Sequence, residues 1–158
     1  MKDRGRMVRS VRHFLAAAPD AIPGIGKYRI LRQIGQGGMA TVYEAEDPQL
    51  HRRVALKVLK TPGDAPTLAS RFHREAAIAA RLRHPNIVGI HEVGLVHEEG
   101  SAATHYIAMD LIEGDTLAVV LQGKTATRDL RLQWFEEIAR AVAYAHASGV
   151  IHRDIKPA

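Results

Sequence analysis

Ile34-Gly35-Gln36-Gly37-Gly38-Met39-Ala40-Thr41-Val42-Tyr43 is the stretch that decides the fold of this chain. It joins two segments, residues 28–34 and 41–45, that are rich in the β-branched and aromatic residues typical of strands. Glycines at such a turn let the backbone bend tightly and approach a bound phosphate group closely. The stretch therefore predicts a hairpin whose turn suits a phosphorylated ligand.

A glycine-rich loop by itself is a weak signal, because dinucleotide-binding folds carry a similar one. In those folds the loop leads into a helix, whereas here Thr41-Val42-Tyr43 leads into a strand. The loop fits the pattern G-x-G-x-x-G-x-V with one change, since Ala40 replaces the third glycine. Ala40 still places a small side chain over the phosphates, so we expect the change to be tolerated.

Three further motifs follow the loop, in a consistent order. They are Val54-Ala55-Leu56-Lys57, Phe72-His73-Arg74-Glu75 and His152-Arg153-Asp154-Ile155-Lys156-Pro157-Ala158. Each has a purely structural alternative: Lys57 as a solvent-facing lysine, Glu75 as an exposed helix residue beside an Arg, and the tail as a disordered basic terminus. For Lys57 taken alone the structural alternative would be preferred, but the order and spacing of all four motifs favour phosphotransfer chemistry.

On these motifs, the chain from about residue 28 to residue 158 resembles the first half of a protein kinase domain. Residues 35–43 and 106–117 look most like bacterial Ser/Thr kinases of the eukaryotic type. The resemblance implies an α+β, protein-kinase-like fold: a complete small lobe of a five-stranded antiparallel sheet plus one helix, and the first helices of a truncated large lobe. It divides the chain into a basic leader and linker (1–26), the small lobe (27–112), and the hinge end with the start of the large lobe (113–158).

Residue periodicity supplies the expected elements. Strands are predicted over residues 28–34, 41–45, 54–59, 87–96 and 104–112. Helices are predicted over residues 67–82, 116–121 and 130–147. The last helix should be closed by Gly149, because a glycine just past a helix end is a common C-terminal cap.

The resemblance also implies a set of nucleotide-binding residues. Ile34, Val42 and Ala55 would enclose the adenine ring, with Met109 as the gatekeeper at the back of the pocket. The adenine edge would bind backbone groups of the segment that follows Met109. The full expected set is Ile34, Gly35, Gln36, Gly37, Gly38, Val42, Ala55, Lys57, Met109, Asp110 and Ile112.

The expected catalytic residues are Lys57, Glu75, Asp154 and Lys156. By the resemblance, Lys57 would bind the α- and β-phosphates and Glu75 would hold Lys57 by an ion pair. Asp154 would accept the proton of the substrate hydroxyl, and Lys156 would contact the transferring phosphate. A Lys at this position is typical of Ser/Thr kinases, so the implied substrates are proteins with Ser or Thr acceptors. The resemblance to kinases as a whole implies ATP and Mg²⁺ as cofactors.

The H-R-D motif lacks its metal-binding partner within these residues. The pattern requires an Asn at position 159 and a D-F-G further on, and neither lies in residues 1–158. We therefore expect this chain to be an incomplete fragment that is inactive alone, with no metal ligands of its own. The alternative is a pseudokinase module that binds a nucleotide or a partner, although Lys57, Glu75 and Asp154 together favour a catalytic ancestor.

Composition excludes several other classes of protein. The chain has no Cys, which rules out disulfides and thiolate metal sites, and its nine His residues show no H-E-x-x-H spacing. Most of the net charge of +5 lies in residues 1–13, which carry five basic residues and one acid, so the body gives no sign of nucleic-acid binding. No apolar run approaches the roughly 20 residues that span a bilayer.

The basic leader is expected to be a flexible extension, with a weak membrane or partner contact as the alternative. We expect the kinase domain to be cytoplasmic, and a membrane anchor after residue 158 is compatible with this expectation.

Overall fold

The structure of this chain is a computed structural model that describes residues 24–60, 66–97, 103–123, 125–152 and 155–156. Residues 1–23, most of the predicted leader and linker, lie outside these ranges, and so do Arg153 and Asp154. The strands are β1 (Gly24–Ile25), β2 (Tyr28–Gln36), β3 (Ala40–Asp47), β4 (Arg52–Leu59), β5 (Ile90–Val96) and β6 (Thr104–Asp110). The helices are α2 (Pro66–Ala79), α3 (Leu117–Gln122) and α4 (Arg128–Ala147).

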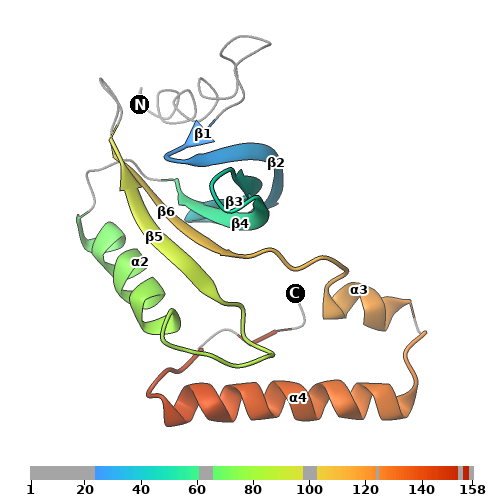
Figure 1. Cartoon of the computed structure of the whole chain (residues 1–158). Helices are drawn as coiled ribbons and strands as arrows, with labels where there is room; N and C mark the ends of the chain where they lie inside the picture. Colours follow the sequence, from blue (N-terminus) through green and yellow to red (C-terminus); the bar gives the residue numbers. More distant parts are fainter. Residues whose placement is uncertain (1–23, 61–65, 98–102, 124, 153–154, 157–158) are drawn as a thin grey trace, which may run out of the picture.

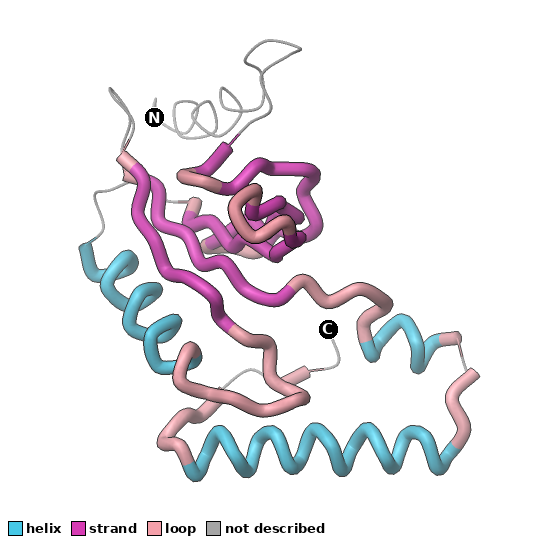
Figure 2. Tube along the Cα trace, viewed as in Figure 1, coloured by secondary structure: helices cyan, strands magenta, loops and turns pink. Residues whose placement is uncertain are grey.

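One antiparallel sheet forms the upper part of the molecule, and its strand order is β1-β2-β3-β4-β6-β5 (Figure 1). Strands β1 to β4 are consecutive hairpins, so each pairs with its neighbour in sequence. The next strand to pair with β4 is β6, and β5 takes the edge. Figure 2 shows the long connection from β4 through α2 that brings β5 to this edge. This α+β arrangement of one antiparallel sheet with one helix packed on it agrees with the small lobe expected from the sequence.

The sheet has six strands where the sequence predicted five. The additional strand is β1, whose Ile25 pairs with Tyr28 across a tight turn. Gly26 at this turn has φ of +58°, a left-handed conformation that glycine adopts at no steric cost. The sequence analysis placed Gly24 and Ile25 in the leader and linker (1–26), because a two-residue strand is too short to show an alternating pattern, and the sheet in fact begins at Gly24.

The two faces of the sheet carry different clusters of apolar side chains. One face holds a buried core made by β1 to β4 and β6: Ile25, Tyr28, Ile30, Tyr43, Ala45, Val54, Leu56, Tyr106 and Ala108. The opposite face packs Leu59 and Ile107 against Phe72 and Ala76 of α2. Phe72 and Ala76 are four residues apart and so lie on one side of the helix. Helix α2 is therefore fixed to the sheet by a narrow apolar contact.

Helix α2 and strand β5 are shorter than predicted because a turn with its own hydrogen bonds lies between them. The helix ends at Ala79 instead of residue 82, and β5 begins at Ile90 instead of residue 87. In the turn, the Ile87 N–H donates to the His84 carbonyl at 3.0 Å and the Asn86 N–H donates to His84 Nδ1 at 3.1 Å. These local bonds satisfy backbone groups that a longer helix or strand would use. At the other end, β6 stops at Asp110 instead of residue 112.

Helices α3 and α4 lie away from the sheet, and α4 runs along the far end of the molecule (Figure 1). Thr116 and Thr127 cap their N-termini, since each side chain accepts a backbone N–H three residues on. Gly149, with φ of +76°, follows the C-cap of α4, as the sequence predicted. Helix α4 buries only Ala141 among its described side chains, and Phe135 is 71% exposed.

None of the helices in the described ranges combines the length and the apolar character needed to cross a membrane.

Candidate active site

The register of the sheet brings predicted nucleotide-binding residues from three strands onto one face. Val42 of β3 lies directly opposite Lys57 of β4, and Ala55 of β4 lies opposite Met109 of β6. Because paired residues share a face and so do residues two apart in a strand, all four side chains project from the same side of the sheet. This is also the face that carries α2, since Leu59 and Ile107 belong to it.

The glycine loop joins β2 to β3 above this face. Gly35 pairs with Val42, so the row Gly35–Val42–Lys57 crosses three strands. Ile34 is 38% exposed and lies at an irregularity in the register between Gln33 and Gly35. The register therefore places Val42 beside Lys57, with Gly35 next to it in the same row.

Packing among the described residues does not account for the glycines at the tip of this loop. The described glycines with positive φ are Gly26, Gly114 and Gly149, so the loop glycines use no left-handed backbone. A Cβ added at Gly38 would meet no atom within 4 Å, and at Gly37 it would meet only the Ala40 carbonyl at 3.7 Å. Open space over the loop is what close approach of a ligand requires, so the space present here fits a bound phosphate group.

Backbone N–H groups at the tip of the loop are available to an anion. The Gly37 N–H donates to the Ala40 carbonyl at 2.9 Å and so closes the turn. Within the described residues, the N–H groups of Gly38 and Met39 donate no hydrogen bond. Adjacent free N–H groups of this kind form a concave anion site.

The segment after β6 matches the expected adenine-binding edge only through its backbone. The Asp110 N–H donates to the Gly89 carbonyl at 2.9 Å, and the Asp110 carboxylate accepts the Gly89 N–H and pairs with His91 at 3.0 Å. The backbone N–H and the carboxylate of Asp110 are therefore both engaged within the lobe. Ile112 is 69% exposed, and in the part of the chain that the structure describes its N–H has no partner.

The expected ion pair between Lys57 and Glu75 is not formed. No salt bridge within 4.0 Å joins them in the described residues, and Glu75 is exposed on α2. The Lys57 ammonium instead lies 5.9 Å from the centre of the Phe72 ring, one turn before Glu75. Lys57 therefore faces α2, but the carboxylate of Glu75 would have to come inward to reach it.

The predicted catalytic loop is only partly described. Asp154 and Arg153 lie outside the described residues, while His152 and Lys156 are exposed. The described residues contain no group of three or more His, Asp or Glu side chains that could hold a metal ion. The roles assigned to Asp154 and Lys156 stay predictions.

Two charged residues that the sequence analysis did not single out border this face. Arg53 binds the carboxylates of Glu44 on β3 and Glu113 after β6, and so links the sheet to the segment leading to α3. Lys60, just after β4, donates to the Gly37 carbonyl in the glycine loop. The sequence held a signal for Lys60, because in consecutive antiparallel hairpins the end of β4 must lie beside the turn between β2 and β3.

A polar cluster on the opposite face stiffens the lobe behind the site. The Glu92 carboxylate of β5 accepts hydrogen bonds from Tyr28 at 2.8 Å and Tyr106 at 2.7 Å, and pairs with Lys27 at 2.8 Å. Burial raises the pKa of Tyr28 to about 12, assisted by the hydrogen bond to Glu92. For Lys27 the hydrogen bond to Glu92 raises the pKa above its ordinary value. These links hold β2, β5 and β6 together.

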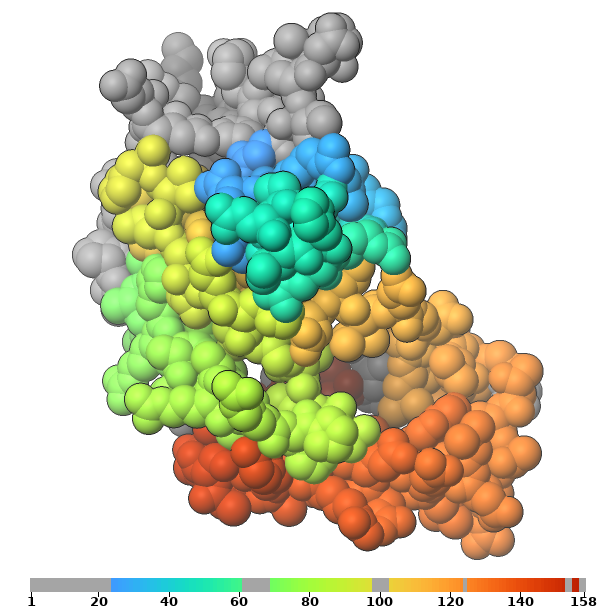
Figure 3. Space-filling model, viewed as in Figure 1, coloured from blue at the N-terminus to red at the C-terminus, as the bar shows by residue number. Residues whose placement is uncertain are grey.

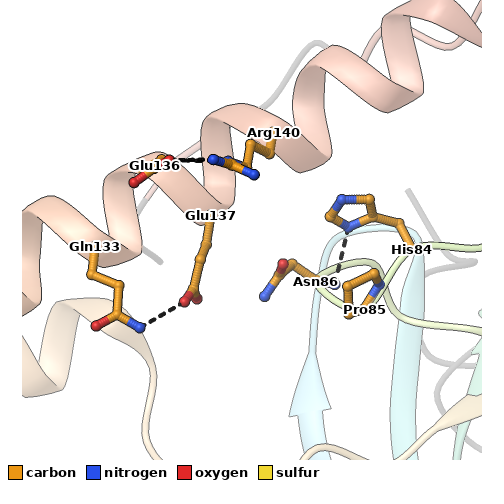
Figure 4. Close-up of a pocket in the computed structure, with 7 residues that line it drawn as sticks. All are labelled: His84, Pro85, Asn86, Gln133, Glu136, Glu137 and Arg140. Carbon is orange, nitrogen blue, oxygen red and sulfur yellow. Dashed lines mark hydrogen bonds and ion pairs between the residues drawn. The ribbon is translucent and has the colours of Figure 1, made fainter.

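A separate hollow of about 410 Å³ lies between the α2–β5 turn and α4 (Figure 4). It is lined by His84, Pro85, Asn86, Gln133, Glu136, Glu137 and Arg140. Next to it, the Arg83 N–H donates to the Tyr144 hydroxyl at 3.2 Å and the Tyr144 ring lies 5.4 Å from that of His84. None of the predicted nucleotide-binding residues lines this hollow.

The space-filling view shows the surface hollowed between the strands and α4, beside the segment that follows β6 (Figure 3). The predicted adenine-binding segment thus borders an open region of the molecule.

Comparison with known proteins agrees with this arrangement. Residues 28–158 match the family model of the protein kinase domain. The chain is 43% identical over 135 residues to the serine/threonine-protein kinase PknA of Mycobacterium tuberculosis, covering 84% of this chain and 31% of PknA. It is 44% identical over 135 residues to the serine/threonine-protein kinase PrkC of Bacillus subtilis, covering 84% of this chain and 20% of PrkC.

The fold is also similar to that of a solved kinase. The crystal structure of the Mycobacterium tuberculosis PknI kinase domain matches with a TM-score of 0.67 and 30% identity, covering 89% of this chain and 57% of that one. The chain thus spans less than a third of the length of the PknA and PrkC relatives and over half of a kinase domain. On the family model, the relatives and the fold together, this chain belongs to the protein kinase family, among bacterial Ser/Thr kinases.

Proposed function

We propose that this protein is an ATP-dependent serine/threonine protein kinase, which transfers the γ-phosphate of ATP to Ser or Thr side chains of protein substrates. The observation that carries the proposal is the shared sheet face on which Val42, Ala55, Lys57 and Met109 gather beneath a glycine loop with free N–H groups. This face offers apolar contacts to a base and a cation and N–H donors to phosphates. Membership of the family implies ATP and a divalent metal ion in general terms.

Each residue has a separate role in this proposal. The Lys57 ammonium binds the α- and β-phosphates, and the Gly38 and Met39 N–H groups donate to phosphate oxygens. Glu75 reaches Lys57 when α2 moves inward, and Asp154 accepts the proton of the substrate hydroxyl while Lys156 contacts the transferring phosphate. Bound Mg²⁺ supplies neutralisation of the phosphate charge.

We further propose that residues 1–158 alone bind ATP and transfer no phosphate, because the Asn expected at position 159 and a D-F-G motif are not among them. Binding is tested by calorimetric titration of the 158-residue chain with ATP, using wild type, Lys57→Met and, as a control, Arg131→Ala on exposed α4. Lys57→Met should weaken binding and Arg131→Ala should not. Absence of any ATP binding by the wild type would contradict the proposal.

Transfer is tested with labelled ATP, magnesium and a protein acceptor, on this chain and on a version continued to the end of its reading frame. The continued protein should label Ser or Thr, and Asp154→Asn should abolish the label. Label found on Tyr alone would contradict the proposed Ser/Thr specificity. Label transferred by residues 1–158 themselves would contradict the proposal that they are inactive alone.

A pseudokinase module is the second candidate, and one observation favours it: Glu75 is exposed and unpaired with Lys57. A kinase that never forms this pair would bind nucleotide without transferring phosphate. ATP binding by the continued protein with no transfer to any protein acceptor would support this candidate.

We also propose that this part of the protein works in the cytoplasm, where ATP is supplied, and that the basic leader makes a weak contact with an anionic membrane or partner. Sedimentation of the chain with anionic but not neutral vesicles, lost on removing residues 1–13, would support the leader contact.

A further inference from the structure

Lys60 touches the glycine loop at two points. Its backbone N–H donates to the Met39 carbonyl at 2.9 Å, and its side-chain ammonium donates to the Gly37 carbonyl. The position follows from the register, because Ala40 at the start of β3 pairs with Leu59 at the end of β4. The residue after Leu59 therefore lies beside the turn. Lys60 lies outside the motifs from which the nucleotide-binding residues were predicted.

The contact fixes the direction of one peptide group in the loop. The Gly37 carbonyl and the Gly38 N–H belong to the same peptide unit, which is planar and trans, and no cis peptide occurs in the described chain. In a trans unit the C=O and the N–H point in opposite directions. Holding the Gly37 oxygen on Lys60 therefore turns the Gly38 N–H to the side away from Lys60.

The remaining groups of the turn are consistent with this direction. The Gly37 N–H and the Gly37 and Met39 carbonyls all have partners inside the protein. Of the described backbone donors at the tip, those of Gly38 and Met39 remain without a partner. The carbonyl oxygens at positions 37 and 39, which would repel an anion, are thus occupied, while the N–H groups that attract it are free.

Charge strengthens the same arrangement. A cation bound to a carbonyl oxygen polarises the peptide group and makes its N–H a better donor, since linked hydrogen bonds reinforce one another. Gly38 carries no side chain, and a Cβ there would meet no atom of the described residues within 4 Å, so its N–H lies in an open part of the loop as the structure describes it.

We propose that Lys60 is a positioning residue of the phosphate site: by holding the Gly37 carbonyl, it aims the Gly38 N–H at a phosphate oxygen of the bound nucleotide. The inference rests on the proposed ATP binding of the chain. Lys60 itself does not need to touch the phosphate, which distinguishes its role from that of Lys57.

The test compares three variants of the 158-residue chain. Lys60→Met keeps the length of the side chain but removes its charge and donors, Lys60→Arg keeps both, and Arg131→Ala removes an exposed positive charge on α4 as a control. Calorimetric titrations with ATP and with adenosine separate phosphate binding from base binding. Hydrogen exchange at the Gly37 N–H, without nucleotide, reports on the turn itself.

Lys60→Met should weaken ATP binding by about threefold to tenfold, the usual worth of one hydrogen bond, and leave adenosine binding unchanged. Lys60→Arg and Arg131→Ala should behave like wild type. In Lys60→Met the Gly37 N–H should exchange faster, because the turn that it closes with Ala40 is loosened.

Two results would overturn the proposal. One is unchanged Gly37 exchange in Lys60→Met, which would show that the contact does not hold the turn, whether or not nucleotide binds. The other is ATP affinity in Lys60→Met equal to that of wild type. If wild type binds no ATP, the proposed function fails, and the exchange measurement alone still decides whether Lys60 positions the loop.

Discussion

Tyr28 and Glu92 are joined by a 2.8 Å hydrogen bond across 64 positions of sequence. Tyr28 begins β2 near one edge of the sheet, and Glu92 lies on β5 at the other edge. The bond can form only because the sheet curls until its two edges approach one another (Figure 1). Tyr106 donates to the other oxygen of the same carboxylate at 2.7 Å.

Replacing Glu92 by Gln should destabilise the chain. The change removes the ion pair with Lys27 and one of the acceptors used by Tyr28 and Tyr106. Leaving a buried hydroxyl unsatisfied costs about 1–3 kcal/mol, and urea unfolding followed by circular dichroism measures it. Glu136→Gln, which breaks an exposed pair with Arg140 on α4, is the matched control and should change the free energy of unfolding by less than about 0.5 kcal/mol. Equal effects of the two substitutions would show that the cluster does not stabilise the fold.

Stability should fall in acid through the same carboxylate. Burial by itself would raise the pKa of Glu92, but hydrogen bonds from Lys27, Tyr106 and Tyr28 outweigh it and hold the pKa below its ordinary value. A lowered folded-state pKa gives stability that is present above the unfolded-state pKa of 4.5 and lost as the pH falls through the folded value. The free energy of unfolding should therefore decrease as the pH is lowered below about 4.5, and more steeply in wild type than in Glu92→Gln. Parallel curves would contradict this assignment.

Two glycine substitutions should differ in what they impair: Gly94→Ala should lower the stability of the fold, and Gly38→Ala should lower the affinity for ATP. A Cβ at Gly94 would lie 2.2 Å from Cζ of the Tyr106 ring, which is buried and hydrogen-bonded, so Gly94→Ala should destabilise the chain by about 1–3 kcal/mol. A Cβ at Gly38 would meet nothing within 4 Å, so Gly38→Ala should leave thermal stability unchanged and weaken ATP binding. Thermal unfolding and calorimetry on both variants check this. A stable Gly94→Ala protein would mean that the Tyr106 ring can move aside.

Two phenylalanines on different helices should differ in their contribution to stability. Phe72 on α2 is 8% exposed and packs against Leu59 and Ile107, whereas Phe135 on α4 is 71% exposed. Phe72→Ala should therefore cost about 3–5 kcal/mol, and Phe135→Ala should stay within about 0.5 kcal/mol. Chemical denaturation of the two variants gives the comparison. A large loss in Phe135→Ala would reveal a partner surface for α4.

Hydrogen exchange should separate the two parts of the chain. The amides of β4 lie in the middle of the sheet over buried side chains, while α4 buries Ala141 alone among its described residues. Amides of α4 should then exchange through low-energy local opening and those of β4 only through larger unfolding. Mass spectrometry of the monomer reads this directly, and equal protection of the two elements would contradict it.

The sequence alone predicted the elements whose residues repeat regularly or carry a motif. Strands β2 to β6 and helices α2 to α4 were placed within a few residues, because alternation and helical spacing are local properties. The glycine loop was recognised together with its strand–turn–strand context, and the hairpin between β2 and β3 followed. The kinase-like fold could be predicted from these local patterns together with the order of four motifs.

Only the tertiary structure decided which residues meet across the sheet. Strand β1 has two residues, too few to show a pattern, and exists because Gly26 turns the chain back onto β2. The contact of Lys60 with Gly37 depends on the register of the strands, and the hydrogen bond of Tyr28 to Glu92 depends on the curl of the sheet. Neither property can be found in a short segment of sequence. Glu75 was predicted to pair with Lys57, but the position of α2 leaves it exposed. Contacts of this kind depend on how separate elements pack, because a helix held by a few apolar side chains can rotate or shift without any change in its own sequence pattern.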